Sequence, residues 1–361
     1  MSRSLSRLAS TGAVLALALG GLAACSSPND SNDGGGGGDK AGKTIALLLP
    51  ESKTTRYETF DKPLFEAKVK DICSDCKVDY YNADQDSAKQ AQQVDTAIGK
   101  GAKVLVLDPV DGKAAASMVT SAHSSDVKVI AYDRFIEGAD YYMSFDNETV
   151  GKMQAQALVD ALGNKGNILM LNGSPTDPNA GQFKKGAHSV IDASGVKILP
   201  GGEYDNPDWS GDNAQKFVAS KLGTYKPTEI QGIYAANDDQ AGGAVAALTG
   251  AGVKDADLPP ITGQDASLAG LQRIVAGQQL MTIYKPIPVE ADQAAETAVA
   301  LLKGDDVGDT TDFQGVKSFI FTPIVVTKDN IKDTVIKDKF YTAQDICTGS
   351  YASACQAAGI S

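Results

Sequence analysis

Polar side chains with strong hydrogen-bonding groups recur directly after the apolar runs of this sequence. The residues are Arg56, Tyr57, Asp133, Arg134, Asp177, Asn179, Trp209, Asn237, Asp238, Asp265 and Lys285. Arginine, aspartate and asparagine supply paired donors and acceptors for hydroxyl groups, and the aromatic rings supply flat apolar surfaces. This chemistry suits a neutral, polyhydroxylated ring. The alternative for any single residue is a capping role in a solvated loop, but that reading is poor for the whole set.

The elements that position these residues alternate between apolar strands and helical patterns. Near-continuous apolar strands separated by helices predict a parallel sheet covered on both faces, and hence a doubly wound α/β lobe. The pattern then restarts, which predicts a second lobe of the same build. The expected strands are residues 44–49, 77–81, 104–107 and 127–131 in the first lobe, and 168–171, 197–199, 232–234 and 260–262 in the second.

Further apolar and helical segments follow the second lobe, at residues 281–284, 289–302 and 319–321. They exceed what the second lobe needs, so we expect the chain to cross between the lobes more than once. Two similar lobes with several crossings form a hinge around a central cleft. In open α/β sheets, ligands bind outside the carboxyl ends of the strands, which is where the candidate residues lie.

The N-terminus has the layout of a secretory signal. Arg3 and Arg7 precede a short apolar stretch, residues 8–22, that is too short for a comfortable membrane span. The segment ends in Leu-Ala-Ala-Cys25, which resembles a bacterial lipobox, in which the cysteine is lipidated. We therefore expect a signal peptide over 1–24, then a lipidated cysteine and flexible linker over 25–43, anchored to the outer face of the cell membrane. The alternative is an ordinary signal peptide in which Cys25 is incidental.

The other four cysteines form two close pairs, Cys73/Cys76 and Cys347/Cys355. Outside the cytoplasm, these pairs are most simply read as two local disulfides. Cys73 and Cys76 could instead form a redox site or half of a zinc site. However, they follow a helical pattern rather than opening a helix, and no second C-x-x-C exists.

Composition excludes several classes of function. The 361 residues carry a net charge of −12, which argues against a nucleic-acid or anionic-membrane surface. The two histidines lie far apart, so no metal site is expected. No hydrolase, metalloprotease or phosphate-binding motif is present, and Asp238 and Asp239 point in different directions as neighbours after a strand. We therefore expect neither an enzyme nor a cofactor.

Several segments at these sites resemble, in the same order, the D-xylose binders of ABC sugar uptake systems, which are type I periplasmic binding proteins. The resemblance runs from about residue 44 to about residue 342. The segments are residues 130–134 (Ile-Ala-Tyr-Asp-Arg), 144–148 (Ser-Phe-Asp-Asn-Glu), 173–177 (Gly-Ser-Pro-Thr-Asp) with 179–180, 237–238 with 241–244, 263–266 (Gly-Gln-Asp-Ala) and 281–286 (Met-Thr-Ile-Tyr-Lys-Pro).

The resemblance implies two lobes joined by three crossover strands, with a sugar in the cleft. One lobe would comprise 44–146 and about 285–320, and the other 147–284 and about 322–361. Polar contacts would come from Arg56, Asp133, Arg134 and Lys285 on the first lobe or hinge, and from Asp177, Asn179, Asn237 and Asp265 on the second lobe and hinge. Ring-face contacts would come from Tyr57, Phe183 and Trp209, with Tyr57 standing where the xylose binders have Trp.

The resemblance also implies the partners. We expect a monomer that delivers a monosaccharide, D-xylose first, to the permease subunits of an ABC transporter. Glucose or another aldose is the alternative ligand, and a sugar sensor coupled to a signalling receptor is the alternative role. A sugar-responsive transcription regulator would need a DNA-binding headpiece in place of residues 1–43. The family pattern does not supply the tail from Asp345 to Ser361, which we expect to be a disulfide-closed loop.

Overall fold

The computed structural model describes residues 43–360, so the predicted signal peptide, Cys25 and most of the linker lie outside it. The first lobe is built on a 7-stranded sheet with the order β10-β11-β5-β4-β3-β1-β2. All neighbouring strands are parallel except β10, which pairs antiparallel with β11 at one edge. The strands are β1 (Thr44–Leu49), β2 (Lys77–Asn82), β3 (Ala102–Leu107), β4 (Lys128–Tyr132), β5 (Tyr141–Phe145), β10 (Thr311–Phe313) and β11 (Val316–Phe321).

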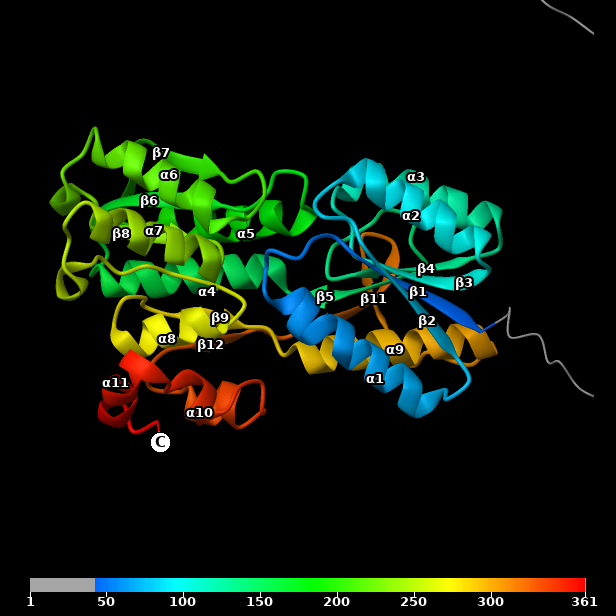
Figure 1. Cartoon of the computed structure of the whole chain (residues 1–361). Helices are drawn as coiled ribbons and strands as arrows, with labels where there is room; N and C mark the ends of the chain where they lie inside the picture. The colour runs from blue at the N-terminus through cyan, green and yellow to red at the C-terminus, as the bar shows by residue number, and fades with distance from the viewer. Residues whose placement is uncertain (1–42, 361) are drawn as a thin grey trace, which may run out of the picture. The chain divides into compact units, whose positions relative to one another are not determined.

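Helices cover both faces of this sheet (Figure 1). Alternation along β1 shows why: Ala46 and Leu48 pack towards α2 and α3, while Ile45, Leu47 and Leu49 pack towards α1 and α9. The helices are α1 (Lys62–Ile72), α2 (Ser87–Gly99), α3 (Gly112–Ser124) and α9 (Ile287–Lys303). A π-helical turn, η2 (Tyr57–Asp61), leads into α1, so Tyr57 lies in a helical turn rather than in the expected loop.

The second lobe has a parallel 3-stranded sheet with the order β7-β6-β8. Helices α4 and α5 cover one face, and α6 and α7 cover the other. The expected strand at 260–262 forms only a single bridge, between Ile233 and Ile261. The elements are β6 (Gly166–Asn172), β7 (Val196–Asp205), β8 (Gly232–Ala235), α4 (Asn147–Ala161), α5 (Pro178–Ile191), α6 (Gly211–Leu222), α7 (Asp238–Gly250) and α8 (Leu268–Ala276), with short 3₁₀ turns η3 (Pro227–Glu229) and η4 (Asp255–Asp257).

The chain passes between the lobes after β5, after β9 (Thr282–Tyr284) and after β11. At the second and third passages, β9 pairs antiparallel with β12 (Ile324–Val326), so these two crossing segments support each other. The predicted fold class, two doubly wound parallel-sheet lobes joined by a three-strand hinge, is confirmed. Among residues 43–360, no helix combines the length and the apolar character that crossing a membrane requires.

The C-terminal segment is helical, which corrects the expectation of a loop. It contains a π-helical turn, η5 (Lys332–Ile336), followed by α10 (Ala343–Ile346), η6 (Gly349–Tyr351) and α11 (Ala352–Ala357). A capping box between Thr342 and Asp345 starts α10, a local signal that the sequence interpretation overlooked.

Both predicted cysteine pairs are joined in the structure. The Cα atoms lie 5.3 Å apart for Cys73 and Cys76, and 5.7 Å apart for Cys347 and Cys355. Both separations fall within the range that disulfides require.

Candidate functional site

A cleft between the lobes collects all of the residues that the family resemblance suggested as sugar contacts. Its own side chains nearly fill it, and only about 20 Å³ is open to the centre of a water-sized molecule. Thr54 and Gln264 also line it, although the sequence interpretation named neither. The predicted residues in its wall are Arg56, Tyr57, Asp133, Arg134, Asp177, Asn179, Phe183, Trp209, Asn237, Asp265 and Lys285.

Arg134 reaches across the cleft from the end of β4 to the second lobe. Its Nε lies 2.8 Å from Oδ2 of Asp177, while Nη1 donates to the carbonyl of Pro109 at 3.0 Å and Nη2 donates to the Tyr57 hydroxyl at 3.1 Å. Trp209 Nε1 donates to the same Asp177 oxygen at 3.1 Å. One carboxylate therefore fixes a cation from the first lobe and an aromatic ring from the second.

Asp177 and Asn237 also cap helices, which addresses the alternative of a purely local role. Asp177 accepts from the backbone N–H of Asn179 at the start of α5, and Asn237 accepts from that of Gln240 at the start of α7. Both side chains are nevertheless buried in the cleft wall rather than solvated. Capping orients these two residues, and it does not exclude contact with a ligand.

A second buried cation, Arg56, is held by three acidic side chains. Nε and Nη2 donate to the two oxygens of Asp61 at 3.0 and 2.6 Å, and Nη1 donates to Asp133 at 3.0 Å. Nη2 also donates to Glu290 on α9 at 2.8 Å. Tyr132 donates its hydroxyl to Asp61 at 2.5 Å. The guanidinium is therefore fixed before any ligand arrives.

The hinge side of the cleft carries the third cation, Lys285, which follows β9 directly. Its Nζ lies 2.9 Å from Oδ1 of Asp265. Nearby, Asn179 of the second lobe donates its Nδ2 to the backbone carbonyl of Asp133 at 3.0 Å, a second contact that joins the two lobes. The side-chain oxygens of Asn179 and Gln264 are buried and accept no hydrogen bond from the described residues. They are free acceptors for ligand hydroxyl groups.

Aromatic rings complete the wall. Phe183 and Trp209 meet edge to face with 6.2 Å between ring centroids, and Lys285 Nζ lies 5.9 Å from the Phe183 centroid. The indole ring of Trp209 occupies the space above Gly173, where an added Cβ would come within 2.0 Å of the ring. Only glycine at position 173 allows this placement, a requirement that the sequence interpretation did not identify.

Three cleft residues adopt left-handed backbone conformations: Asp133 at φ 57°, Trp209 at φ 62° and Asp265 at φ 86°. Such conformations are uncommon for residues other than glycine and concentrate at functional sites. Asp133 follows β4, Trp209 lies in the loop after β7, and Asp265 follows the bridge at Ile261, so a turn directs each side chain into the cleft.

Burial and charge pairing set the protonation of the cleft carboxyls. Burial opposes ionisation of Asp133, but Arg56, Lys285 and Arg134 together hold its pKa below the usual value. Burial raises the pKa of Glu290 to about 8 despite the neighbouring Arg56, and it also raises the pKa of Asp108. Asp133 is therefore ionised at neutral pH, while burial favours the neutral form of Glu290.

Each cation of the cleft already faces a carboxylate: Arg56 faces Asp133 and Asp61, Arg134 faces Asp177, and Lys285 faces Asp265. An anionic ligand would have to compete with these carboxylates for the cations. A neutral ligand can accept from the N–H groups and donate to the carboxylates without disturbing the charge balance. The cleft is therefore suited to a neutral polyhydroxylated molecule.

One candidate residue from the sequence lies outside the cleft. Asp238 does not line the cleft, because its carboxylate accepts from Gln279 Nε2 at 2.7 Å and from the backbone N–H of Ser267 at 2.8 Å, between α7 and α8. Two of the three buried acidic partners of Arg56, Asp61 and Glu290, were missed. Glu290 had a detectable signal, because it shares the apolar face of its helix with Ala294 and Ala298.

Comparison with known proteins identifies the family. Residues 45–306 match the family model described as "Periplasmic binding protein domain". The chain is 39% identical over 312 residues to the D-xylose-binding periplasmic protein of Escherichia coli (strain K12), covering 84% of this chain and 92% of that protein. The D-xylose-binding periplasmic protein of Haemophilus influenzae is 37% identical over 311 residues, covering 84% of this chain and 91% of that protein.

A solved structure agrees with this assignment. An ABC transporter solute-binding protein from Clostridium phytofermentans with bound β-D-glucose superposes with a TM-score of 0.76 at 26% identity, covering 84% of this chain and all of that chain. Family membership, rather than any missing motif, supports the expectation that the chain is a binding protein and not an enzyme. The chain belongs to the periplasmic binding protein family, in its type I branch.

Proposed function

We propose that this chain is an exported solute-binding protein that captures a monosaccharide, D-xylose first, and delivers it to an ABC permease. The observation that carries the proposal is the cleft itself, in which three paired cations and the faces of Phe183 and Trp209 surround a small buried space. The similarity to D-xylose-binding proteins across more than four-fifths of the chain supports the choice of sugar.

Capture works by differential binding to two arrangements of the lobes. A sugar held by Arg134 from one side and by Asn237 and Asp265 from the other contacts both lobes only when they are closed. Its binding free energy therefore favours closure, and the hinge segments absorb the motion. The closed form is the state that we propose the permease recognises.

Glucose is the second candidate ligand, because it is the sugar bound to the Clostridium phytofermentans structure. An aldohexose in the pyranose form differs from xylose by one hydroxymethyl group. A pocket distinguishes such a difference by about 1–3 kcal/mol, depending on the space beside that carbon.

A thermal-shift panel tests the ligand class. The purified protein should gain stability with D-xylose, less with D-glucose, and least with D-ribose and L-arabinose. Arg134→Ala, which removes one side of the site, should show a smaller shift with every sugar. The absence of a shift with all four sugars would contradict the proposal, and the largest shift with glucose would revise the ligand.

We also propose that Cys25 carries a lipid anchor, with the segment 25–43 as a tether. A random-coil chain of roughly 18 residues spans on the order of 20–25 Å. Cys25→Ser should release the exported protein into the soluble fraction while leaving sugar affinity unchanged. Membrane association that survives this substitution would remove the anchor from the proposal. Light scattering tests the further expectation that the protein is a monomer.

A further inference from the structure

The C-terminal segment, residues 332–360, completes a hydrophobic cluster behind the sugar cleft. Its buried members Phe340, Ile346, Cys355 and Ile360 pack with Leu271 and other residues of α8, with Tyr284 of β9 and with Ile287 of α9. The segment lies beyond residues 45–306, which the family model covers.

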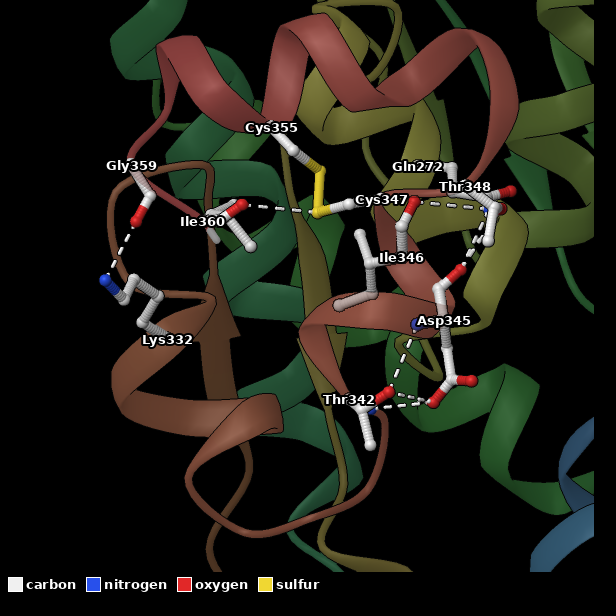
Figure 2. The surroundings of a disulfide bond; sticks show 10 residues. All are labelled: Gln272, Lys332, Thr342, Asp345, Ile346, Cys347, Thr348, Cys355, Gly359 and Ile360. Atoms are coloured by element: carbon white, nitrogen blue, oxygen red, sulfur yellow. Dashed lines mark hydrogen bonds between the residues drawn. A yellow bond between two sulfur atoms is a disulfide. The ribbon is translucent and has the colours of Figure 1, made fainter.

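Polar contacts hold this segment together, and one of them joins it to α8. Figure 2 shows Thr342 and Asp345 capping α10, and Gln272 of α8 donating its Nε2 to the carbonyl of Ile346 at 3.4 Å. Lys332 Nζ donates to the carbonyl of Gly359 at 2.8 Å, close to the end of the chain. A disulfide between Cys347 and Cys355 links the end of α10 to α11. The tail is thus an ordered part of the second lobe.

An aromatic contact extends from this segment to the first lobe. The rings of Phe60 and Phe340 stack with 3.9 Å between centroids and 21° between planes. Tyr341 meets Phe60 edge to face at 5.3 Å, and Tyr284 lies 5.1 Å from Phe340. Phe60 belongs to η2, the turn that also contains Tyr57 and Asp61. Phe340 follows the third crossing, so the stack bridges the lobes near the hinge.

The cluster adjoins three segments that supply cleft residues. Ala266 follows Asp265, Tyr284 precedes Lys285, and Phe60 lies one turn after Arg56. The cluster thus packs against the segments that carry Arg56, Lys285 and Asp265 into the cleft. A change in the packing of Phe340 would be transmitted to all of them, because protein interiors are densely packed and adjust only by coordinated shifts.

We infer that Phe340 and Phe60 are positioning residues for sugar binding: their stack favours the arrangement of η2 and the hinge in which the cleft groups face one ligand. This inference rests on the proposed function, because sugar affinity is its readout. Neither ring lines the cleft, so neither residue is a ligand contact. The stack joins η2 of the first lobe to the tail of the second lobe, so its energy contributes to the equilibrium between open and closed lobes that the sugar shifts.

A double-mutant cycle on sugar affinity tests the inference. Phe60→Leu, Phe340→Leu and the double variant are titrated with D-xylose by calorimetry, and the dissociation rate is measured by stopped flow. The matched control is Phe217→Leu in the second lobe, outside the cleft wall. Like Phe60, Phe217 is half-buried and stacks on another ring, that of Tyr204, with 4.6 Å between centroids. Phe60 is only partly buried, so its replacement should leave the fold intact.

We expect each single variant to weaken D-xylose binding about threefold to tenfold, mainly through faster dissociation. The double variant should lose no more than the worse single one, because the two rings form one contact. Phe217→Leu should lower the melting temperature about as much as Phe60→Leu does, while D-xylose affinity stays at the wild-type value.

Wild-type affinity in Phe60→Leu and Phe340→Leu would overturn the inference, and additive losses would show that the rings do not act as one contact. Failure of the wild-type protein to bind D-xylose or D-glucose would instead count against the proposed function. The two failures are therefore distinguishable in the same experiment.

Discussion

Asp177 of the second lobe pairs with Arg134 of the first lobe, with 2.8 Å between Oδ2 and Nε. Both side chains are almost fully buried, so the pair is screened little by solvent. A charge pair across the cleft stabilises the closed arrangement only while both partners are present. Removal of one partner leaves the other buried without its counter-charge. The free-energy cost of that unpaired charge exceeds the stabilisation that the intact pair provides.

The first prediction follows from that pair. Arg134→Ala removes a charged donor from the cleft, and the loss of hydrogen bonds to a charged group costs about 1.5–3 kcal/mol. D-xylose affinity should therefore fall by roughly tenfold to more than a hundredfold in calorimetry. Lys128→Ala serves as the control, because Lys128 pairs with Asp140 on the outside of the first lobe. Equal affinities in the two variants would place the sugar elsewhere.

The second prediction concerns Gly173, which lies against the Trp209 ring. Gly173→Ala places a Cβ within 2.0 Å of the Trp209 ring, so the indole must move. Overpacking of this kind costs about 1–3 kcal/mol, and we expect about a tenfold loss of sugar affinity with a lowered melting temperature. Gly181→Ala on α5 is the control, because an added Cβ there meets no atom within 4 Å. If Gly173→Ala bound sugar as tightly as Gly181→Ala, the proposed ring-face contact between Trp209 and the sugar would be contradicted.

A third prediction concerns the mouth of the cleft, where Lys53 of the first lobe donates to Asp208 of the second at 2.7 Å. The Lys53 side chain is 55% exposed, so the pair should contribute only about 0.2–1 kcal/mol and be weakened by salt. Lys53→Gln should reduce sugar affinity by about twofold to fivefold at low ionic strength. The difference from wild type should shrink at high ionic strength.

The control for this ion pair is Lys185→Gln. Lys185 pairs with Glu148 at 2.7 Å, but both residues belong to the second lobe, so their pair does not depend on lobe closure. The substitution should leave sugar affinity unchanged at both ionic strengths. An equal effect from the two substitutions would mean that general charge, rather than the contact between lobes, controls binding.

The sequence indicates many of the residues that line the cleft because strand ends are marked locally. An apolar run that stops at Asp133-Arg134 or Asn237 identifies both the strand and the position of its carboxyl end. Parallel strands direct these ends to one edge of a sheet, so the tertiary position follows from the local pattern. The resemblance to xylose binders added Phe183, which lies within a helix and has no such local marker.

Other features depend on contacts between distant segments and could not be read locally. Asp61 and Glu290 are separated by more than 200 residues, yet they hold the same guanidinium. The tail was expected to be a loop because the family pattern does not supply it. Its packing on α8 is not visible in apolar periodicity, whereas the capping box of Thr342 and Asp345 was a local signal that the interpretation overlooked.

The fourth prediction is chemical. Non-reducing peptide mapping of the exported protein should find Cys73 linked to Cys76 and Cys347 linked to Cys355. In both pairs the Cα atoms lie within 6 Å, at 5.3 and 5.7 Å, so neither link requires the backbone to move. A long-range pair such as Cys73 with Cys355 would contradict the local pairing and the packing of the tail on α8.

The last prediction uses the half-buried carboxyl of Asp239 at the start of α7. Burial raises its pKa to about 7, and the neighbouring carboxylates of Asp238, Asp265 and Glu51 act in the same direction, against Arg273. In the unfolded chain, an aspartate titrates near pH 4. Between these values the folded state binds more protons than the unfolded state, so the free energy of unfolding falls as the pH rises through this window.

Asp239→Asn removes this penalty, because the amide stays neutral at every pH. We expect the variant to melt at a higher temperature than wild type at about pH 8, and the difference to shrink or vanish at about pH 4.5, where folded Asp239 is already protonated. Asp212→Asn on α6 is the control, because it removes the same charge from an exposed position. A stabilisation of Asp239→Asn that is equal at both pH values would mean that titration of Asp239 does not govern the effect. An equal gain from Asp212→Asn at pH 8 would assign the gain to net charge.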